Sequence, residues 1–175
     1  EVAGDERGVE LAEWSAWNQL LPALCPDGST WTYHLPITGP KRFARHGGQE
    51  GEEGGALSCC HTNGQRGLAL LPQYFYTVDN TGALCVNFYG ESAATIMIPG
   101  VGEVRVEQHT RFPRDGEVEL HLHSDSSNTY RLRIRRPRWA DTLLINGVPI
   151  AEAGVRHEIQ CRGDSLIRIS LCMKP

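Results

Sequence analysis

The second half of the chain is a series of short runs rich in β-branched and aromatic residues, separated by Gly, Pro, Asp, Asn and Ser. Many short strands at regular spacing predict an antiparallel β-sandwich. In one run Tyr130, Leu132 and Ile134 alternate with Arg131, Arg133 and Arg135, which predicts one buried and one solvated face. Asn146-Gly147 predicts a hairpin turn. The runs after Tyr74 are ALCVNFY, ATIMI, VRVEQ, VELHLH, TYRLRIR, TLLIN, RHEIQ and SLIRISL.

The first part of the chain carries a helical pattern instead. Between Val9 and Leu24 the apolar residues recur at spacings of three and four, which predicts one amphipathic helix. Asn63 is expected to cap a second helix that ends near Pro72. Because two helices cannot close a core by themselves, we expect them to belong to a larger assembly and to leave an apolar face uncovered. The apolar residues of the first helix are Leu11, Trp14, Trp17, Leu20, Leu21 and Leu24.

Charge and hydropathy exclude two classes of partner. The net charge is −4 and the pI is about 6.0, so no general basic excess is present to bind nucleic acid or anionic lipid. No apolar run approaches the roughly 20 residues that cross a bilayer. The chain begins at Glu1, so a targeting segment could precede it. We expect a cytoplasmic protein, and the sequence leaves export open.

Six cysteines are present, and the adjacent pair Cys59-Cys60 is the one that suggests chemistry. The pair lies between a Gly-rich segment and a predicted helix, where a helix N-terminus favours thiolates, and thiolates are ligands that zinc prefers. A closed zinc site needs four ligands, so structural cysteines, a vicinal disulfide and a redox pair remain alternatives. Cys25, Cys85 and Cys172 are expected to be structural, because each adjoins apolar residues.

Three other polar groups have simpler explanations. The arginines of the run 131–138 are expected to form a solvated strand face, with polyanion binding as the minor alternative. His121 and His123 share one strand face and could approach a metal together, although a polar surface face is the favoured interpretation. The segment 39–55 is Gly-rich and charged, and we assign it no function.

Four segments of the chain resemble the bacterial β-L-arabinofuranosidases, a family related to glycoside hydrolase family 127. The segments are EWSAWN (13–18), DGSTWTYHLPI (27–37), SCCHTNGQRGLALLPQYFY (58–76) and YRLRIRRPRWADTLLINGVPI (130–150), followed by GDSLIRISLCM (163–173). In this family an α-helical toroid carries the active site and precedes β-sandwich domains. The resemblance therefore implies an α+β fragment: the last helices of an (α/α)6 toroid at 1–76, then an antiparallel β-sandwich at 77–175.

The resemblance also implies a site and a mechanism. Cys59 would be the nucleophile and a zinc ligand, Cys60 a second zinc ligand, and Glu13 and Tyr33 would contact the sugar. The implied reaction is retaining, through a thioglycosyl intermediate on Cys59. The acid/base glutamate and the remaining zinc ligands, a Glu-x-Cys motif that residues 1–175 do not contain, are expected upstream. His61-Thr62 replace the two prolines that often follow the Cys pair, so substrate preference could differ.

We therefore expect a zinc-dependent arabinofuranosidase-like enzyme that binds an oligosaccharide or glycoside, of which this chain is an inactive fragment without the rest of the catalytic domain. A homodimer is one assembly that it could form. The first rival interpretation is a non-catalytic carbohydrate-binding or structural β-sandwich. The second is a redox or metal-storage role for the Cys pair.

Overall fold

The structure, a computed structural model, describes residues 6–29, 31–32, 35–40, 59–151 and 156–173, and it does not describe the side chains of 59–61. The chain divides into two compact units. One comprises Leu11–Gln73, and the other comprises Glu1–Glu10 with Tyr74–Pro175. Each unit is therefore described by itself. No helix among the described residues is long and apolar enough to cross a bilayer.

The predicted first helix is present as a nearly continuous helical stretch. Helix α1 (Glu6–Ser15) is followed by a π-helical segment, η1 (Ala16–Leu20), and by the short α2 (Leu21–Ala23), which carries a proline in its first turn. Leu24 is extended and forms an isolated bridge with Trp31. The helical stretch thus ends one residue before the predicted end at Leu24 and begins three residues before the predicted start at Val9.

The apolar face of this stretch is only partly covered. Leu11 and Trp14 are 66% and 55% exposed. The buried positions are Glu13 and Ala16. Helical periodicity identifies an apolar stripe, but whether the stripe is covered depends on which elements pack against it. The expectation of an uncovered apolar face is thus confirmed at Trp14, whereas Trp17 and Leu21 are half-buried.

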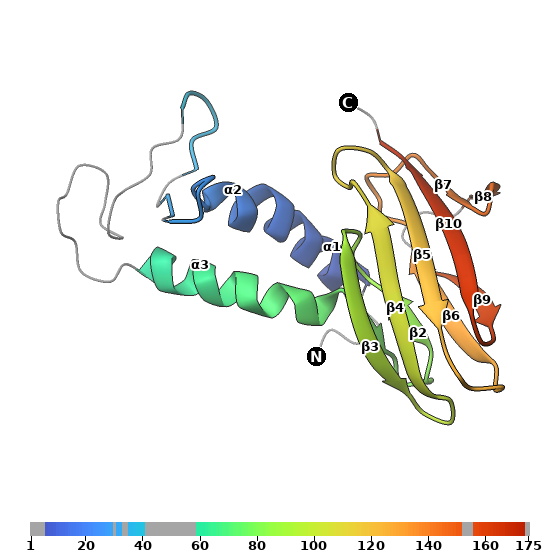
Figure 1. Cartoon of the computed structure of the whole chain (residues 1–175). Coiled ribbons are helices and arrows are strands. Elements are labelled where there is room, and N and C mark those ends of the chain that lie inside the picture. Colours follow the sequence, from blue (N-terminus) through green and yellow to red (C-terminus); the bar gives the residue numbers. More distant parts are fainter. Residues whose placement is uncertain (1–5, 30, 33–34, 41–58, 152–155, 174–175) are drawn as a thin grey trace. The chain divides into compact units, whose positions relative to one another are not determined.

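Helix α3 (Cys59–Leu70) continues into the 3-10 helix η3 (Leu71–Tyr74), which contains Pro72. Asn63 was expected at its N-cap but lies inside the helix, at an exposed position. Within the helical unit, α3 runs antiparallel to the stretch from α1 to α2, as Figure 1 shows. The two are in close contact at Gly67, where a Cβ would lie 3.0 Å from Leu20 Cδ1.

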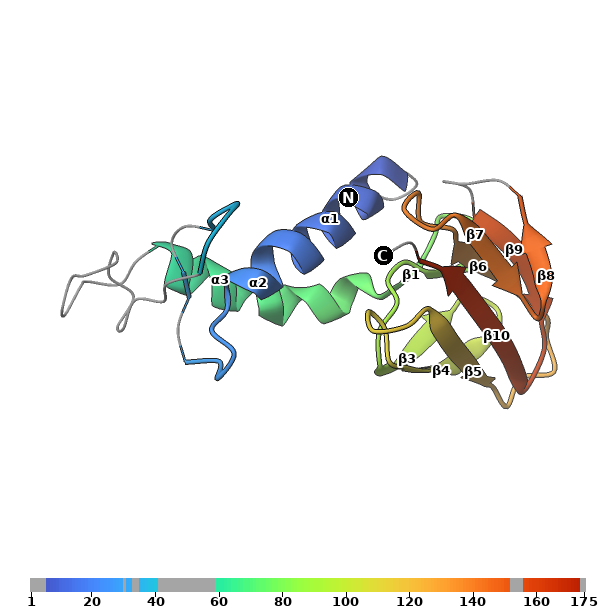
Figure 2. The same cartoon turned by 90° about the horizontal axis from the view of Figure 1, so that it is seen from above.

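The predicted β-sandwich is confirmed, with two sheets that pack face to face (Figure 2). The four-stranded sheet has the order β1-β2-β6-β9, and the six-stranded sheet has the order β3-β4-β5-β10-β7-β8. All pairs are antiparallel except β2 with β6, which is parallel. The strands are β1 (Tyr76–Val78), β2 (Leu84–Val86), β3 (Ser92–Ile98), β4 (Gly102–Thr110), β5 (Glu117–His123), β6 (Tyr130–Arg135), β7 (Thr142–Ile145), β8 (Val148–Ile150), β9 (Arg156–Cys161) and β10 (Ser165–Cys172).

The core of the sandwich lies between the inner faces of the two sheets. Tyr130, Leu132 and Ile134 are buried there, as their alternation predicted. They share one apolar cluster with residues of the opposite sheet, among them Leu120 and Ile169. Burial of this continuous apolar surface is the main favourable contribution to folding of the unit.

The predicted hairpin is also confirmed. Strands β7 and β8 pair antiparallel, and the two residues between them, Asn146 and Gly147, have φ values of 50° and 79°. Positive φ at both positions is what a two-residue hairpin turn with the right-handed strand twist requires. Asn146 also accepts a hydrogen bond from the backbone N–H of Arg168, at 2.9 Å, so the turn is attached to β10.

Candidate functional site

The Cys pair forms the first two residues of α3. A helix N-terminus presents backbone N–H groups that have no partner within the helix, and these groups favour an anionic ligand or thiolate. The backbone therefore places Cys59 and Cys60 where nucleophilic or metal-binding sulfur chemistry is favoured. Their side chains lie outside the described part of the structure, as does the whole of Tyr33.

The segment between α2 and Tyr33 is a tight turn built on Asp27. Asp27 accepts two hydrogen bonds from Ser29, one from its backbone N–H at 2.9 Å and one from its hydroxyl at 2.7 Å. Hydrogen bonds from Ser29 lower the pKa of Asp27 to about 2. Gly28 has a φ of 74°, a conformation that glycine adopts without strain. The DGS motif therefore shapes the chain rather than supplying a proton donor.

Trp31 attaches this segment to α3. Its ring is buried and lies so close to Gly64 that a Cβ on that residue would be 2.6 Å from Trp31 Cδ2. The backbone N–H of Thr32 donates to the carbonyl of Ala23 at 2.8 Å, which completes the attachment on the other side. The sequence pattern did not predict this contact. Its signal was a glycine within the helical segment that follows the Cys pair.

The structure does not bring Glu13 next to the Cys pair. Glu13 is 2% exposed and lies on α1, seven residues before Leu20, whereas Cys60 lies seven residues before Gly67 on α3. Leu20 packs on Gly67. Because the two helices run antiparallel, Glu13 and Cys60 lie in opposite directions from this contact, and the two intervals of seven residues add. At 1.5 Å per residue they separate Glu13 from the Cys pair by roughly 20 Å along the helices.

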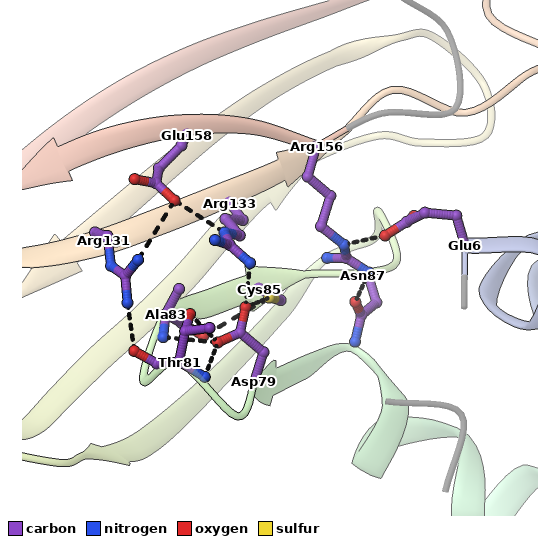
Figure 3. Close-up of polar contacts among 10 residues, drawn as sticks. All are labelled: Glu6, Asp79, Thr81, Ala83, Cys85, Asn87, Arg131, Arg133, Arg156 and Glu158. Carbon is purple, nitrogen blue, oxygen red and sulfur yellow. Dashed lines mark hydrogen bonds and ion pairs between the residues drawn. The ribbon is translucent and has the colours of Figure 1, made fainter. Parts of the chain in front are cut away.

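The arginine run has intramolecular partners on the outer face of the four-stranded sheet (Figure 3). Arg133 contacts Asp79 Oδ2 at 2.5 Å and Glu158 Oε2 at 2.9 Å, and Arg131 donates to the carbonyl of Thr81. Arg135 is fully buried, so the predicted solvated face is wrong at this position. Because these guanidinium groups already have carboxylate and carbonyl partners, the arginine run has a structural role.

Asp79 is the central acceptor of that network. Burial of its carboxylate would raise the pKa, but hydrogen bonds from Thr81 and Ala83 and the positive charge of Arg133 outweigh burial and lower the pKa of Asp79 to about 2. Thr81 and Ala83 belong to the turn between β1 and β2. The carboxylate therefore joins this turn to β6.

The two histidines of β5 lie on the outer face of the six-stranded sheet. His123 Nδ1 lies 2.5 Å from Asp164 Oδ1, and His121 Nε2 lies 3.7 Å from Glu119 Oε2. Both histidines line a shallow depression of about 500 Å³. Within the described ranges, no group of three or more His, Cys, Asp or Glu side chains could hold a metal ion. A polar surface face is thus the interpretation that the geometry supports.

The remaining cysteines differ in exposure. Cys85 and Cys161 are buried, and burial raises the pKa of both thiols, that of Cys161 to about 11. Cys25 is half-buried. Cys172 is exposed on the outer side of β10, so its predicted structural burial is wrong. Strand alternation explains the difference, because its neighbour Leu171 occupies the inner face.

Comparison with known proteins relates this geometry to one family. The sequence model of the GH127 beta-L-arabinofuranosidase middle domain matches residues 83–165, which lie in the sandwich. No curated protein matches the chain. A solved structure described as a glycoside hydrolase is 26% identical, with a TM-score of 0.78, over 99% of this chain and 30% of that protein.

Two further solved structures share the fold. A GH127 beta-L-arabinofuranosidase from Geobacillus stearothermophilus T6 is 22% identical, with a TM-score of 0.74, over 98% of this chain and 29% of that one. A GH127 beta-arabinofuranosidase is 20% identical, with a TM-score of 0.75, over 96% of this chain and 29% of that one. The chain thus spans less than a third of the length of each of these three structures.

Proposed function

We propose, from the premise that this chain is GH127-like, that the protein to which it belongs is a glycoside hydrolase acting on arabinofuranosides or related plant-derived sugars. The observation that carries the proposal is the family match over residues 83–165, together with the likeness of nearly the whole chain to a solved glycoside hydrolase. The order of elements, two helices before a sandwich, fits the C-terminal part of a helical catalytic domain. The (α/α)6 toroid is part of the proposal.

The proposed nucleophile is Cys59. Its sulfur attacks the anomeric carbon, the bond from that carbon to the leaving oxygen breaks, and the leaving oxygen takes a proton from a general acid. Water then attacks the same carbon and gives a proton to the conjugate base of that general acid, the carbon–sulfur bond breaks, and the thiolate is restored. Two displacements at one carbon give overall retention of configuration. The position of Cys59 at the start of α3 supports this role, because helix N-termini favour thiolates.

Cys59 and Cys60 supply two thiolate donors, which are the ligand type that zinc prefers. The donor set thus fits zinc in kind, and two further ligands are needed to close a four-coordinate site. We propose that the remaining ligands and the acid/base glutamate come from outside residues 1–175. A zinc ion held by the pair would keep the Cys59 sulfur deprotonated at neutral pH. The chain alone is then expected to be inactive.

Tyr33 is proposed to contact the sugar near Cys59. Glu13 is proposed to bind a part of the substrate remote from the bond that breaks, because the helix pair separates Glu13 from the Cys pair by roughly 20 Å. A substrate longer than one sugar would reach both positions. Linked sugars are therefore the substrate class that is consistent with both assignments.

One observation favours a second candidate function. The family model matches the sandwich and not the helical unit, which is also what a non-catalytic carbohydrate-binding or structural module would show. Zinc content discriminates the two functions. The enzyme is expected to bind about one zinc ion per protein and to lose it in Cys60→Ser, whereas a sandwich module needs no metal.

The test of the proposed function is hydrolysis of p-nitrophenyl α- and β-arabinofuranosides by the full-length protein. Cys59→Ser is expected to lower kcat by at least about 10³-fold, because a hydroxyl is a far weaker nucleophile than a thiolate at neutral pH. Removal of zinc with a chelator is expected to do the same. Cys172→Ser, which changes an exposed cysteine of the sandwich, is the control and should leave kcat unchanged. Activity that survives Cys59→Ser would remove Cys59 as the nucleophile.

A further inference from the structure

Asn87 lies at the end of β2 and joins four segments of the sandwich unit. It is 5% exposed. Its side-chain Nδ2 donates to the carbonyl of Tyr74 at 3.0 Å and to Thr77 Oγ1 at 3.1 Å. Its Oδ1 accepts from Arg156 Nη2 at 2.7 Å, and its backbone carbonyl accepts from Arg135 Nε at 2.8 Å. A buried amide with this many partners rigidifies the segments that it joins.

The two arginines extend this cluster to the beginning of α1. Arg156 donates from Nε to Glu6 Oε1, as Figure 3 shows for Glu6, Arg156 and Asn87. Arg135 Nη1 lies 3.6 Å from Glu10 Oε1. Glu10 Oε1 also accepts from the backbone N–H of Arg138 at 2.7 Å. The arginine side chains at 135 and 156 are 0% and 15% exposed, so water screens these pairs little.

The location of these contacts gives them a function. The helical unit comprises Leu11–Gln73, so the chain enters it directly after Glu10 and leaves it directly before Tyr74. Glu10 is bound by Arg135, and the Tyr74 carbonyl is bound by Asn87. Both covalent connections to the unit that carries Cys59 and Cys60 are therefore attached to one polar cluster, Glu6, Glu10, Asn87, Arg135 and Arg156, here called the Asn87 cluster.

We propose that Asn87 is a positioning residue, which with Arg135 and Arg156 holds the two points where the chain enters and leaves the helical unit. This inference rests on the proposed function, because it assigns the sandwich a part in the reaction at Cys59. Asn87 touches no substrate in this proposal. It acts through α1 and through η3, which follows directly on the helix of the Cys pair. Misplacement of a reacting group by about 1 Å can cost on the order of 10²-fold in rate.

The test compares Asn87→Asp and Glu6→Gln with the wild type in the full-length protein. Asn87→Asp keeps the shape of the side chain and the acceptor for Arg156, but it loses the Nδ2 donor and sets a carboxylate oxygen against the Tyr74 carbonyl. Glu6→Gln removes only the charge from the pair with Arg156. Because Glu6 is partly exposed, this second variant is expected to fold even if the first does not.

Two readouts are needed. On p-nitrophenyl arabinofuranoside, kcat is expected to fall about 10- to 100-fold in Asn87→Asp and less in Glu6→Gln, while KM changes less than about threefold. Hydrogen exchange measured by mass spectrometry is expected to become faster in residues 6–15 and 71–78. Asn128→Asp is the matched control, because the Asn128 amide also donates to a backbone carbonyl, that of Gly100, at 2.9 Å. It should change neither readout.

The outcomes separate this inference from the proposed function. An active wild type with an unchanged kcat in both variants would overturn the positioning role, whatever the exchange data show. Unchanged exchange in residues 6–15 and 71–78 would overturn the anchoring itself, even in a protein without activity. A wild type that hydrolyses no furanoside, but whose exchange responds to Asn87→Asp, would refute the proposed function and retain the anchoring.

Discussion

Arg131, Arg133 and Arg135 share one face of β6, yet their side chains are 35%, 28% and 0% exposed. Strand alternation predicted correctly that they would lie opposite the apolar residues. It could not predict that Glu10 of α1 would contact the last of them. A buried guanidinium group is tolerated only when partners replace its water, and Asn87 and Glu10 supply such partners.

The depressed pKa of Asp79 predicts a specific acid sensitivity. A carboxyl whose pKa falls from 3.8 to about 2 on folding contributes stability that is complete above about pH 4 and is lost as the pH falls towards 2. Asp79→Asn should therefore lower the free energy of unfolding by about 1–2 kcal/mol at pH 7 and by much less at pH 2. Urea unfolding of the protein at both pH values measures the difference.

The control for this prediction is Asp125→Asn. The carboxylate of Asp125 is fully exposed and lies 3.7 Å from a histidine nitrogen. Exposed pairs contribute little to stability, so this variant should unfold like the wild type at both pH values. An Asp79→Asn effect that is equally large at pH 2 and pH 7 would show that the lost contribution is packing and not the charge.

At the scale of elements, α3 illustrates how packing overrides intrinsic helix preference. Gly64 and Gly67 are intrinsically unfavourable in a helix, since glycine has a low helix propensity. Both glycines nevertheless lie within α3, because Trp31 and Leu20 pack directly on their backbone. Each glycine that lowers the helix propensity of this segment is thus a position where another side chain packs closely on the helix.

Substitution of Gly64 tests this explanation. Alanine normally stabilises a helix by about 1 kcal/mol relative to glycine, but here its Cβ would lie 2.6 Å from the buried Trp31 ring. We expect Gly64→Ala to lower the free energy of unfolding by about 1–3 kcal/mol, because a rigid ring cannot move aside without repacking. Thermal and urea unfolding provide the measurement.

Gly67→Ala is the matched control for Gly64→Ala. A Cβ there would meet the flexible end of Leu20 at 3.0 Å, so the change in stability should stay within about 1 kcal/mol of the wild type. If Gly64→Ala proved as stable as Gly67→Ala, the contact with Trp31 would not explain the glycine.

At the scale of the whole molecule, the two units differ in how completely they cover their apolar surface. The sandwich encloses a continuous core between its sheets. The helical unit leaves Leu11 and Trp14 exposed on α1 and buries Glu13 instead. The chain also spans only 30% of the solved glycoside hydrolase that it resembles. These observations fit a chain whose helical unit packs against further protein in the proposed enzyme.

The exposed stripe predicts dye binding. A fluorescent dye for apolar surfaces should bind the 175-residue chain, because Leu11 and Trp14 are adjacent exposed apolar residues on one helix face. The double variant Leu11→Gln with Trp14→Gln should lower the fluorescence at least about twofold. Leu166→Gln is the control, since Leu166 is 42% exposed among charged residues of the six-stranded sheet. Equal fluorescence in the double variant and the control would contradict the prediction.

Periodicity and turn chemistry in the sequence were enough to predict two helical segments, most of the strands, the inner face of the sandwich and the hairpin at Asn146, because these depend on residues close together in the chain. The tertiary structure alone decided the parallel pairing of β2 with β6 and the burial of Arg135 and Glu13. Each of these features depends on which element, distant in the sequence, packs next to the residue in the folded chain. Local sequence patterns carry little information about that choice, since the same apolar stripe or polar face can meet water, a helix or another domain.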